Sequence, residues 1–99
     1  QLLAKDTRTL YGAEAKYLVA LQWYNAGNYA SAEKEILNFI DQSTPHAYWL
    51  ARSFILLSDV YVAMDKKLDA RQYLLSLQQN YQADDDIASM INERLEKLK

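Results

Sequence analysis

A chain of 99 residues is long enough for one domain and too short for two. Apolar residues make up 51% of it and charged residues 24%, which excludes a disordered chain, because disorder requires low hydrophobicity and high net charge. The formal charge of −2 argues against nucleic acid as a partner, since duplex-binding domains usually carry a basic surplus.

The scarce residue types narrow the fold class and the chemistry further. Cysteine is absent, so the chain has no disulfide, thiolate nucleophile or cysteine-based zinc site. Two glycines and one proline provide few turns, which predicts a mostly helical protein with few breaks. No apolar run approaches the ~20 residues that span a bilayer. The chain begins with Gln1 and shows no signal peptide, so we expect a fragment of a longer protein.

Apolar residues recur at intervals of three and four along the chain, as they do in amphipathic helices. The first interruption lies at Gly27 and Asn28, where Gly27 suits the left-handed residue that ends a helix and Asn28 suits a cap of the next one. The second lies at Thr44 and Pro45, a good N-cap followed by a good first helical residue. A third, weaker one lies at Asp65. The pattern predicts five helices, at about 3–26, 29–42, 45–64, 67–81 and 85–98.

The fourth interruption ends in three consecutive carboxylates, Asp84, Asp85 and Asp86. A calcium loop would need alternating oxygen ligands, a glycine turn and a distal glutamate, and this run has neither the spacing nor the glycine. Carboxylates at a helix N-terminus complement the helix dipole. We therefore interpret all three as capping residues of the last helix.

The side chains that could perform catalysis form no recognisable arrangement. His46 is the only histidine, so a two-histidine zinc site is excluded, and its place after Pro45 favours a surface position at a helix start. No serine has a Gly-x-Ser-x-Gly context, no carboxylate pair matches a glycosidase, and two isolated glycines cannot form a phosphate loop. We therefore expect no enzymatic activity, no metal and no cofactor.

Sliding the chain against itself by 38 residues aligns its second and fourth predicted helices. The small residues Ala32 and Ala70 coincide, and Gly27 meets Asp65, which tolerates a left-handed backbone better than most residues. Small residues at matched places would let antiparallel helices approach closely, with large residues filling the space between them. The other matched pairs are Val19 with Leu57, Ala20 with Ser58, Trp23 with Tyr61, Ile36 with Leu74 and Phe39 with Leu77.

This pattern resembles the tetratricopeptide repeat, a helix–turn–helix unit of about 34 residues. The second repeat departs from it, because Asp65 stands in place of the glycine and Lys67 in place of the aromatic residue found at Tyr29. Similar lengthened repeats occur in bacterial cell-envelope proteins, such as the outer-membrane assembly lipoproteins and the Tol–Pal coordinator, and residues 44–57 look closest to large repeat proteins of Gram-negative bacteria. The matching residues are Ala20-x2-Trp23-x3-Gly27-x-Tyr29-x2-Ala32 and Ser58-x2-Tyr61-x3-Asp65-x4-Ala70.

The resemblance implies an all-α fold, a tetratricopeptide-like right-handed α-solenoid of about five helices. Residues 1–99 would form one domain, with repeat one at about 13–44, repeat two at about 45–82 and a C-terminal capping helix at about 85–98. The last helix suits that role because it has one apolar stripe and is polar or charged elsewhere. The stripe consists of Ile87, Ile91, Leu95 and Leu98.

The same resemblance implies a non-enzymatic module for protein–protein interaction or scaffolding, in which the first helix of each pair lines a concave groove. We expect a protein or peptide partner that Tyr17, Tyr24 and Arg52 contact as partly exposed anchors, with Asp59 nearby. Clamp domains that hold a C-terminal carboxylate use lysine and asparagine on this face, and these are missing here, so we do not expect such a clamp. The groove residues are Glu14, Tyr17, Leu21, Tyr24, Arg52, Ile55, Asp59 and Val62.

Two alternatives stay open. Tyr17 and Tyr24 lie two helical turns apart on one face, and they could equally pack against an earlier repeat or another helix of the same chain. The domain could also be the structural C-terminal cap of a longer solenoid, with no partner site of its own. The resemblance suggests the periplasm or the outer membrane as the location and envelope assembly as the process, and the oligomeric state stays open.

Overall fold

In the computed structural model the described residues are 10–41, 47–82 and 85–98. Within these ranges the protein has five α-helices and no strand, which confirms the predicted all-α class and the number of helices. Residues 3–9 of the first predicted helix, Thr44, Pro45, His46 and Asp84 lie outside the described residues. The helices are α2 (Leu10–Asn25), α3 (Tyr29–Asp41), α4 (Ala47–Ala63), α5 (Lys67–Asn80) and α6 (Ile87–Lys97).

The turns after α2 and α4 have the same backbone geometry at equivalent places of the two repeats. Gly27 has φ +83° and Asp65 has φ +62°, so both adopt the left-handed conformation that the sequence predicts. The N–H of Asn28 donates to the carbonyl of Trp23 at 2.9 Å, and that of Lys66 donates to the carbonyl of Tyr61 at 2.7 Å. These bonds satisfy carbonyls that a helix end would otherwise leave without a partner.

The acidic run before α6 caps this helix through one of its members. The carboxylate of Asp85 accepts a hydrogen bond of 3.0 Å from the backbone N–H of Ile87. The side chain of Asp86 makes no capping bond and accepts the Tyr48 hydroxyl instead, at 2.9 Å. The capping interpretation is thus confirmed for Asp85, whereas Asp86 occupies the N-cap position but its carboxylate accepts a tyrosine from another helix in place of a backbone N–H.

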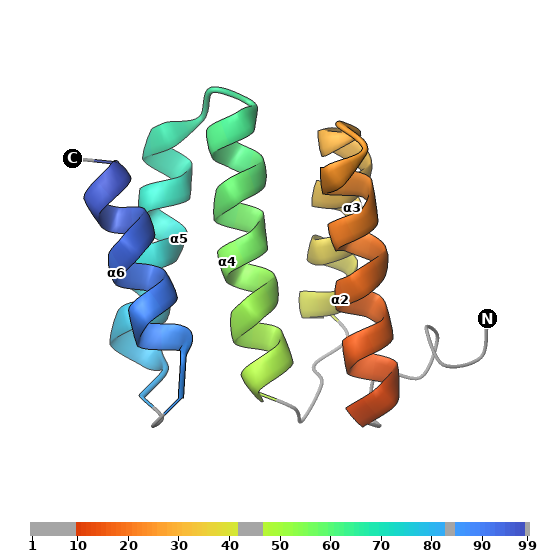
Figure 1. Cartoon of the computed structure of the whole chain (residues 1–99), viewed down its shortest axis with the longest axis horizontal. Coiled ribbons are helices and arrows are strands. Elements are labelled where there is room, and N and C mark those ends of the chain that lie inside the picture. Colours follow the sequence, from red (N-terminus) through yellow and green to blue (C-terminus); the bar gives the residue numbers. More distant parts are fainter. Residues whose placement is uncertain (1–9, 42–46, 83–84, 99) are drawn as a thin grey trace.

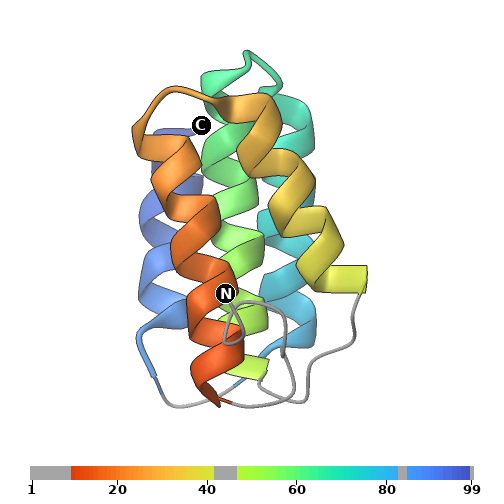
Figure 2. The same ribbon diagram turned by 90° about the vertical axis from the view of Figure 1, so that its right-hand side faces the viewer.

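The helices form two layers, as Figures 1 and 2 show. α2, α4 and α6 lie side by side in one layer, and α3 and α5 lie behind them in the other. Each helix packs against the next one in the chain, and α4 also packs against α2 and α6 within its own layer. α4 therefore contacts every other described helix and is the centre of the fold. None of the described helices has the length and apolar character needed to cross a membrane.

The small residues matched by the repeat lie where helices touch. Ala32 and Ala70 are fully buried, and Ala20 is 2% exposed. They belong to a core between α2, α3, α4 and α5 that includes Ile36 and Tyr61. A second core joins α4, α5 and α6 and consists of Ala51, Ile55, Leu74, Leu77, Ile87 and Ile91.

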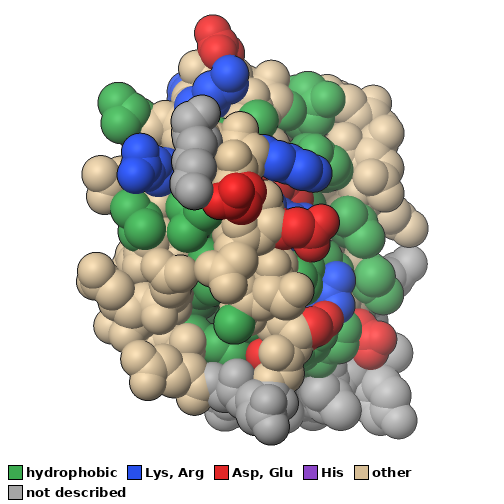
Figure 3. Space-filling model, turned by 60° about the vertical axis from the view of Figure 1, so that its left-hand side comes forward, with side chains coloured by type: hydrophobic (Ala, Val, Ile, Leu, Met, Phe, Trp, Pro, Cys, Tyr) green, Lys and Arg blue, Asp and Glu red, His purple; other side chains and the backbone are tan. Residues whose placement is uncertain are grey.

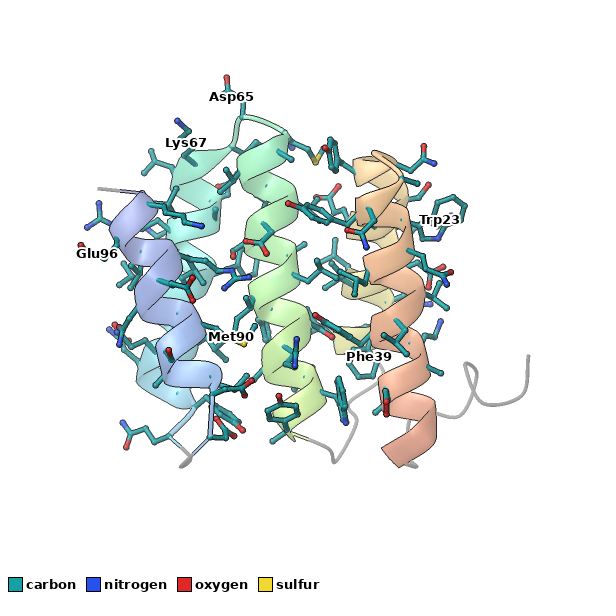
Figure 4. All side chains as sticks on the ribbon, viewed as in Figure 1. Trp23, Phe39, Asp65, Lys67, Met90 and Glu96 are labelled. Atoms are coloured by element: carbon teal, nitrogen blue, oxygen red, sulfur yellow. The ribbon has the colours of Figure 1, made fainter. Side chains whose placement is uncertain are left out.

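One large residue of the repeat lies outside this core. Tyr61 is 7% exposed, whereas its equivalent Trp23 is 39% exposed, so the sequence expectation that both pack in the interior is wrong for Trp23. Figure 4 shows the Trp23 side chain pointing away from the other helices. Tyr61 is covered because α2 and α3 pack on its face of α4, while no described helix lies beyond α2 on that side.

Enlarging the buried alanines should destabilise the fold. We expect Ala32→Leu and Ala70→Leu each to lower the free energy of unfolding by ~1–3 kcal/mol, because overpacking a full interior forces backbones apart. Ala30→Leu is the matched control, since Ala30 lies on the same helix as Ala32 and is exposed. Urea unfolding followed by circular dichroism measures the three variants, and equal midpoints for all would contradict the close helix contact.

Candidate functional site

A pocket of about 480 Å³ lies where α2, α4 and α6 converge with the beginning of α5. We call it the central pocket. Figure 3 looks at the α6 side of the molecule and shows acidic, basic and hydrophobic side chains next to one another in its upper half. The pocket is lined by Tyr24, Ser58, Asp59, Val62, Ala63, Lys67, Leu74, Glu93, Arg94, Lys97 and Leu98.

An ion pair between α4 and α6 forms one wall of the central pocket. Arg94 donates from Nε to Oδ1 of Asp59 at 2.9 Å and from Nη2 to Oδ2 at 3.1 Å. Its Nη1 also donates to the carbonyl of Met90 at 3.2 Å. Both charged side chains are about three-quarters buried, with 26% and 25% exposed, so water screens this two-bond contact only partly. The contact fixes the orientation of α6 relative to α4.

Tyr24 brings a hydroxyl to the same pocket. Burial raises the pKa of Tyr24, the negative charge of Asp59 raises it further, and Arg94 opposes them. The phenol therefore stays protonated at neutral pH and can donate a hydrogen bond. Its ring packs against Tyr29 with centroids 5.7 Å apart, which holds the side chain at the end of α2.

Arg52 lies on α4 among aromatic side chains. Its guanidinium carbon is 5.2 Å from the centroid of Tyr17 and 5.8 Å from those of Tyr48 and Trp49. It donates to the hydroxyl of Tyr48 at 3.1 Å and to that of Tyr17 at 3.4 Å. Burial disfavours the charged guanidinium and lowers its pKa. The two hydrogen bonds favour the charged form and outweigh burial, so the pKa of Arg52 is raised. The Nε atom is buried without a hydrogen-bond partner, and no carboxylate among the described residues pairs with Arg52.

Two tyrosines tie the connection between α5 and α6 to the helices. Tyr48 at the start of α4 donates to Asp86, and Tyr81 after α5 donates to Asp85. Burial and the hydrogen bond to Asp85 raise the pKa of Tyr81 to about 12. Both tyrosine hydroxyls thus hold the beginning of α6 in place.

The structure brings three of the eight predicted groove residues together in the central pocket, namely Tyr24, Asp59 and Val62. Tyr24 and Asp59 are half-buried, and Val62 is 37% exposed. Glu14, Leu21 and Arg52 are half-buried and lie outside the pocket lining.

Two predicted groove residues, Tyr17 and Ile55, are buried, which corrects the groove prediction and, for Tyr17, agrees with the open alternative that it packs against another helix of the same chain. Tyr17 is 6% exposed, because its ring packs against Trp49 with centroids 5.5 Å apart and lies under Arg52. Ile55 is 1% exposed, because it belongs to the core that α6 closes. The sequence placed both on the correct helices but did not show which neighbours would cover them.

Sequence reasoning missed the pocket residues that α5 and α6 supply. Arg94 and Lys97 belong to the last helix, which was interpreted only as a cap, and Lys67 lies at the start of α5. Arg94 pairs with a carboxylate 35 residues away, and no local spacing signals such a contact. The only signal in the sequence that α6 could supply basic pocket residues was the pair of basic residues in its last turn, Arg94 and Lys97.

The comparisons with known proteins give no relative. No family model, no curated protein and no solved structure matches this chain. Within the part of the chain that the structure describes, no three histidine or carboxylate side chains converge so that they could hold a metal ion.

The ion pair in the central pocket should stabilise the fold measurably. A double-mutant cycle with Asp59→Asn and Arg94→Met is expected to give a coupling energy of about 1 kcal/mol, the upper end for pairs near a surface. The control cycle breaks the single 3.4 Å contact between Lys16 and Glu35 and should give a smaller value. Urea unfolding at low salt measures both, and equal coupling in the two cycles would contradict the role of the two-bond geometry.

The raised pKa of Tyr81 has a consequence at alkaline pH. Because its folded value of about 12 lies above the ordinary value of 10.0, the stability it contributes is complete below the ordinary value and is lost as the pH rises through about 12. We expect the stability of the parent chain to fall more between about pH 8 and about pH 11 than that of Tyr81→Phe. Urea unfolding at the two pH values measures the difference, and parallel losses in both chains would refute it.

Proposed function

We propose that the chain is a non-enzymatic protein-binding module, a tetratricopeptide-like solenoid with two helix pairs and a capping helix. The matched alanines, the two equivalent left-handed turns and the packing of each helix on the next support this arrangement. In it, α2 and α4 are the first helices of the two pairs, and their shared layer, completed by α6, is the binding face. Because the repeat resembles those of bacterial cell-envelope proteins, we propose scaffolding in the bacterial envelope as its role.

The central pocket is the observation that carries this proposal. It combines an exposed apolar side chain, Val62, with a phenol donor and a set of charged groups. Lys67, Arg94 and Lys97 bring three positive charges, and Asp59 and Glu93 bring two negative ones. Such a mixed, partly apolar surface suits a segment of protein, and the net charge of −2 disfavours nucleic acid and anionic lipid.

A structural cap is the second candidate function. α6 supports it, because Ile87 and Ile91 are buried against α4 and α5 while Asn92, Glu93 and Glu96 on its other faces are exposed. A polar outer face on the last helix is what ends a solenoid. The two candidates differ in whether the central pocket holds a partner.

The test compares a pocket residue with an exposed residue elsewhere. A photo-crosslinking amino acid at position 62 is expected to capture one protein from extracts of the source cell, and the same group at position 68 on α5 is not. The captured protein is then purified and titrated against the parent chain, Val62→Asp and Leu68→Asp. We expect Val62→Asp to weaken binding by about tenfold or more and Leu68→Asp to leave it unchanged.

Both variants should keep the helical circular dichroism spectrum, because Val62 and Leu68 are exposed, the latter by 74%. Equal affinities of the two variants would place any binding site outside the central pocket. Failure of position 62 to capture a protein would favour the structural cap.

A further inference from the structure

An apolar surface lies on the side of α2 that faces away from the rest of the fold. Leu18 and Trp23 are 45% and 39% exposed, and Val19 beside them is half-buried. We call these three residues the α2 outer face. Val19 and Trp23 lie one helical turn apart and Leu18 directly precedes Val19, so the three residues span an arc of roughly 140° on the helix surface. Figure 2 looks at this end of the molecule, where α2 and α3 lie in front.

The repeat shows what normally covers this face. A shift of 38 residues relates Leu18 to Leu56, Val19 to Leu57 and Trp23 to Tyr61. These three residues of α4 are 3%, 0% and 7% exposed. They lie in the core formed with Tyr17 and Ala20 of α2 and Ala32 and Ile36 of α3. On α4, therefore, the equivalent face is covered by a helical hairpin, while on α2 no described helix covers the matching apolar residues.

We propose that the α2 outer face is the stacking surface for one more helical hairpin, supplied by the polypeptide upstream of α2 in a longer protein. The hairpin packs on α2 as α2 and α3 pack on α4, with small residues in the places of Ala20 and Ala32. The direction of the chain agrees with this proposal, because α2 and α4 run parallel to each other in their layer. The second helix of a preceding hairpin would therefore lead into α2 in the same way that α3 leads into α4.

A second copy of this chain cannot supply the hairpin surface that covers the equivalent face of α4. The side of the α2–α3 hairpin that would be needed, with Tyr17, Ala20, Ala32 and Ile36, is buried against α4 in each molecule. At the opposite end, α6 covers the apolar surface of α4 and α5 and presents exposed polar residues. We therefore assign the hairpin to a segment of the same polypeptide. This inference rests on the repeat architecture and is independent of partner binding at the central pocket.

The experiment compares residues 1–99 with a chain that also carries about 40 residues of its natural upstream sequence, roughly one repeat. Leu18→Gln is made in both chains, and Leu68→Gln on α5 is the matched control. In the 99-residue chain we expect both substitutions to be nearly neutral, since both leucines are exposed. In the longer chain Leu18→Gln should raise the equilibrium constant of unfolding by about tenfold or more, because it leaves a buried amide without a partner, and Leu68→Gln should not.

Acrylamide quenching gives an independent readout. The contribution of Trp23, obtained by comparing each chain with its Trp23→Phe variant, should be strongly quenched in residues 1–99 and protected in the longer chain. A neutral Leu18→Gln together with unprotected Trp23 in the longer chain would overturn the proposal. So would sedimentation of residues 1–99 as a dimer that Leu18→Gln dissociates, because the occupant would then be a second copy. Loss of partner binding in Val62→Asp leaves all these readouts unchanged.

Discussion

The structure depends on the close approach of helices at small side chains. Ala13 and Ala32 are fully buried, as is Ala70, and Ser58 bonds its hydroxyl to the carbonyl of Ile55 on its own helix, so it takes little space at the helix contact. With small residues at these places, large side chains such as Ile36 and Tyr61 can fill the space above and below each contact. A larger residue would separate α2 and α4, and the central pocket, where α2, α4 and α6 converge, would change with them.

The helices that pack on α4 decide which of its residues are buried and which are exposed. Arg52, Ile55, Asp59 and Val62 follow one another at helical spacing. α6 covers Ile55 and provides Arg94 to Asp59, while Val62 near the end of α4 stays 37% exposed. The last helix thus closes a core and supplies the charged wall of the central pocket. Its two roles are inseparable, because the same packing that buries Ile87 positions Arg94.

Two arginines of this layer, Arg94 and Arg52, are partly buried, and different contacts stabilise their charges. Arg94 forms two hydrogen bonds with a carboxylate, which compensates its loss of water. Arg52 lies over three aromatic rings and bonds two phenols, and its Nε remains buried without a partner. An unpaired buried donor costs ~1–3 kcal/mol, so the aromatic contacts around Arg52 must offset that loss. Both arginines connect α4 to a neighbouring element, α6 in one case and α2 in the other.

The sequence by itself determined the helices, their turns and the repeat. Five helices lie where the periodicity predicts them within the described ranges, and Gly27 and Asp65 adopt the left-handed backbone, because these features depend on residues a few positions apart. Only the tertiary structure decided that Tyr17 and Ile55 are buried and that Trp23 is exposed. It also decided that Arg94 meets Asp59. Burial and ion pairing depend on which helices become neighbours in space, and helical spacing along one segment carries no information about the segment that will cover it.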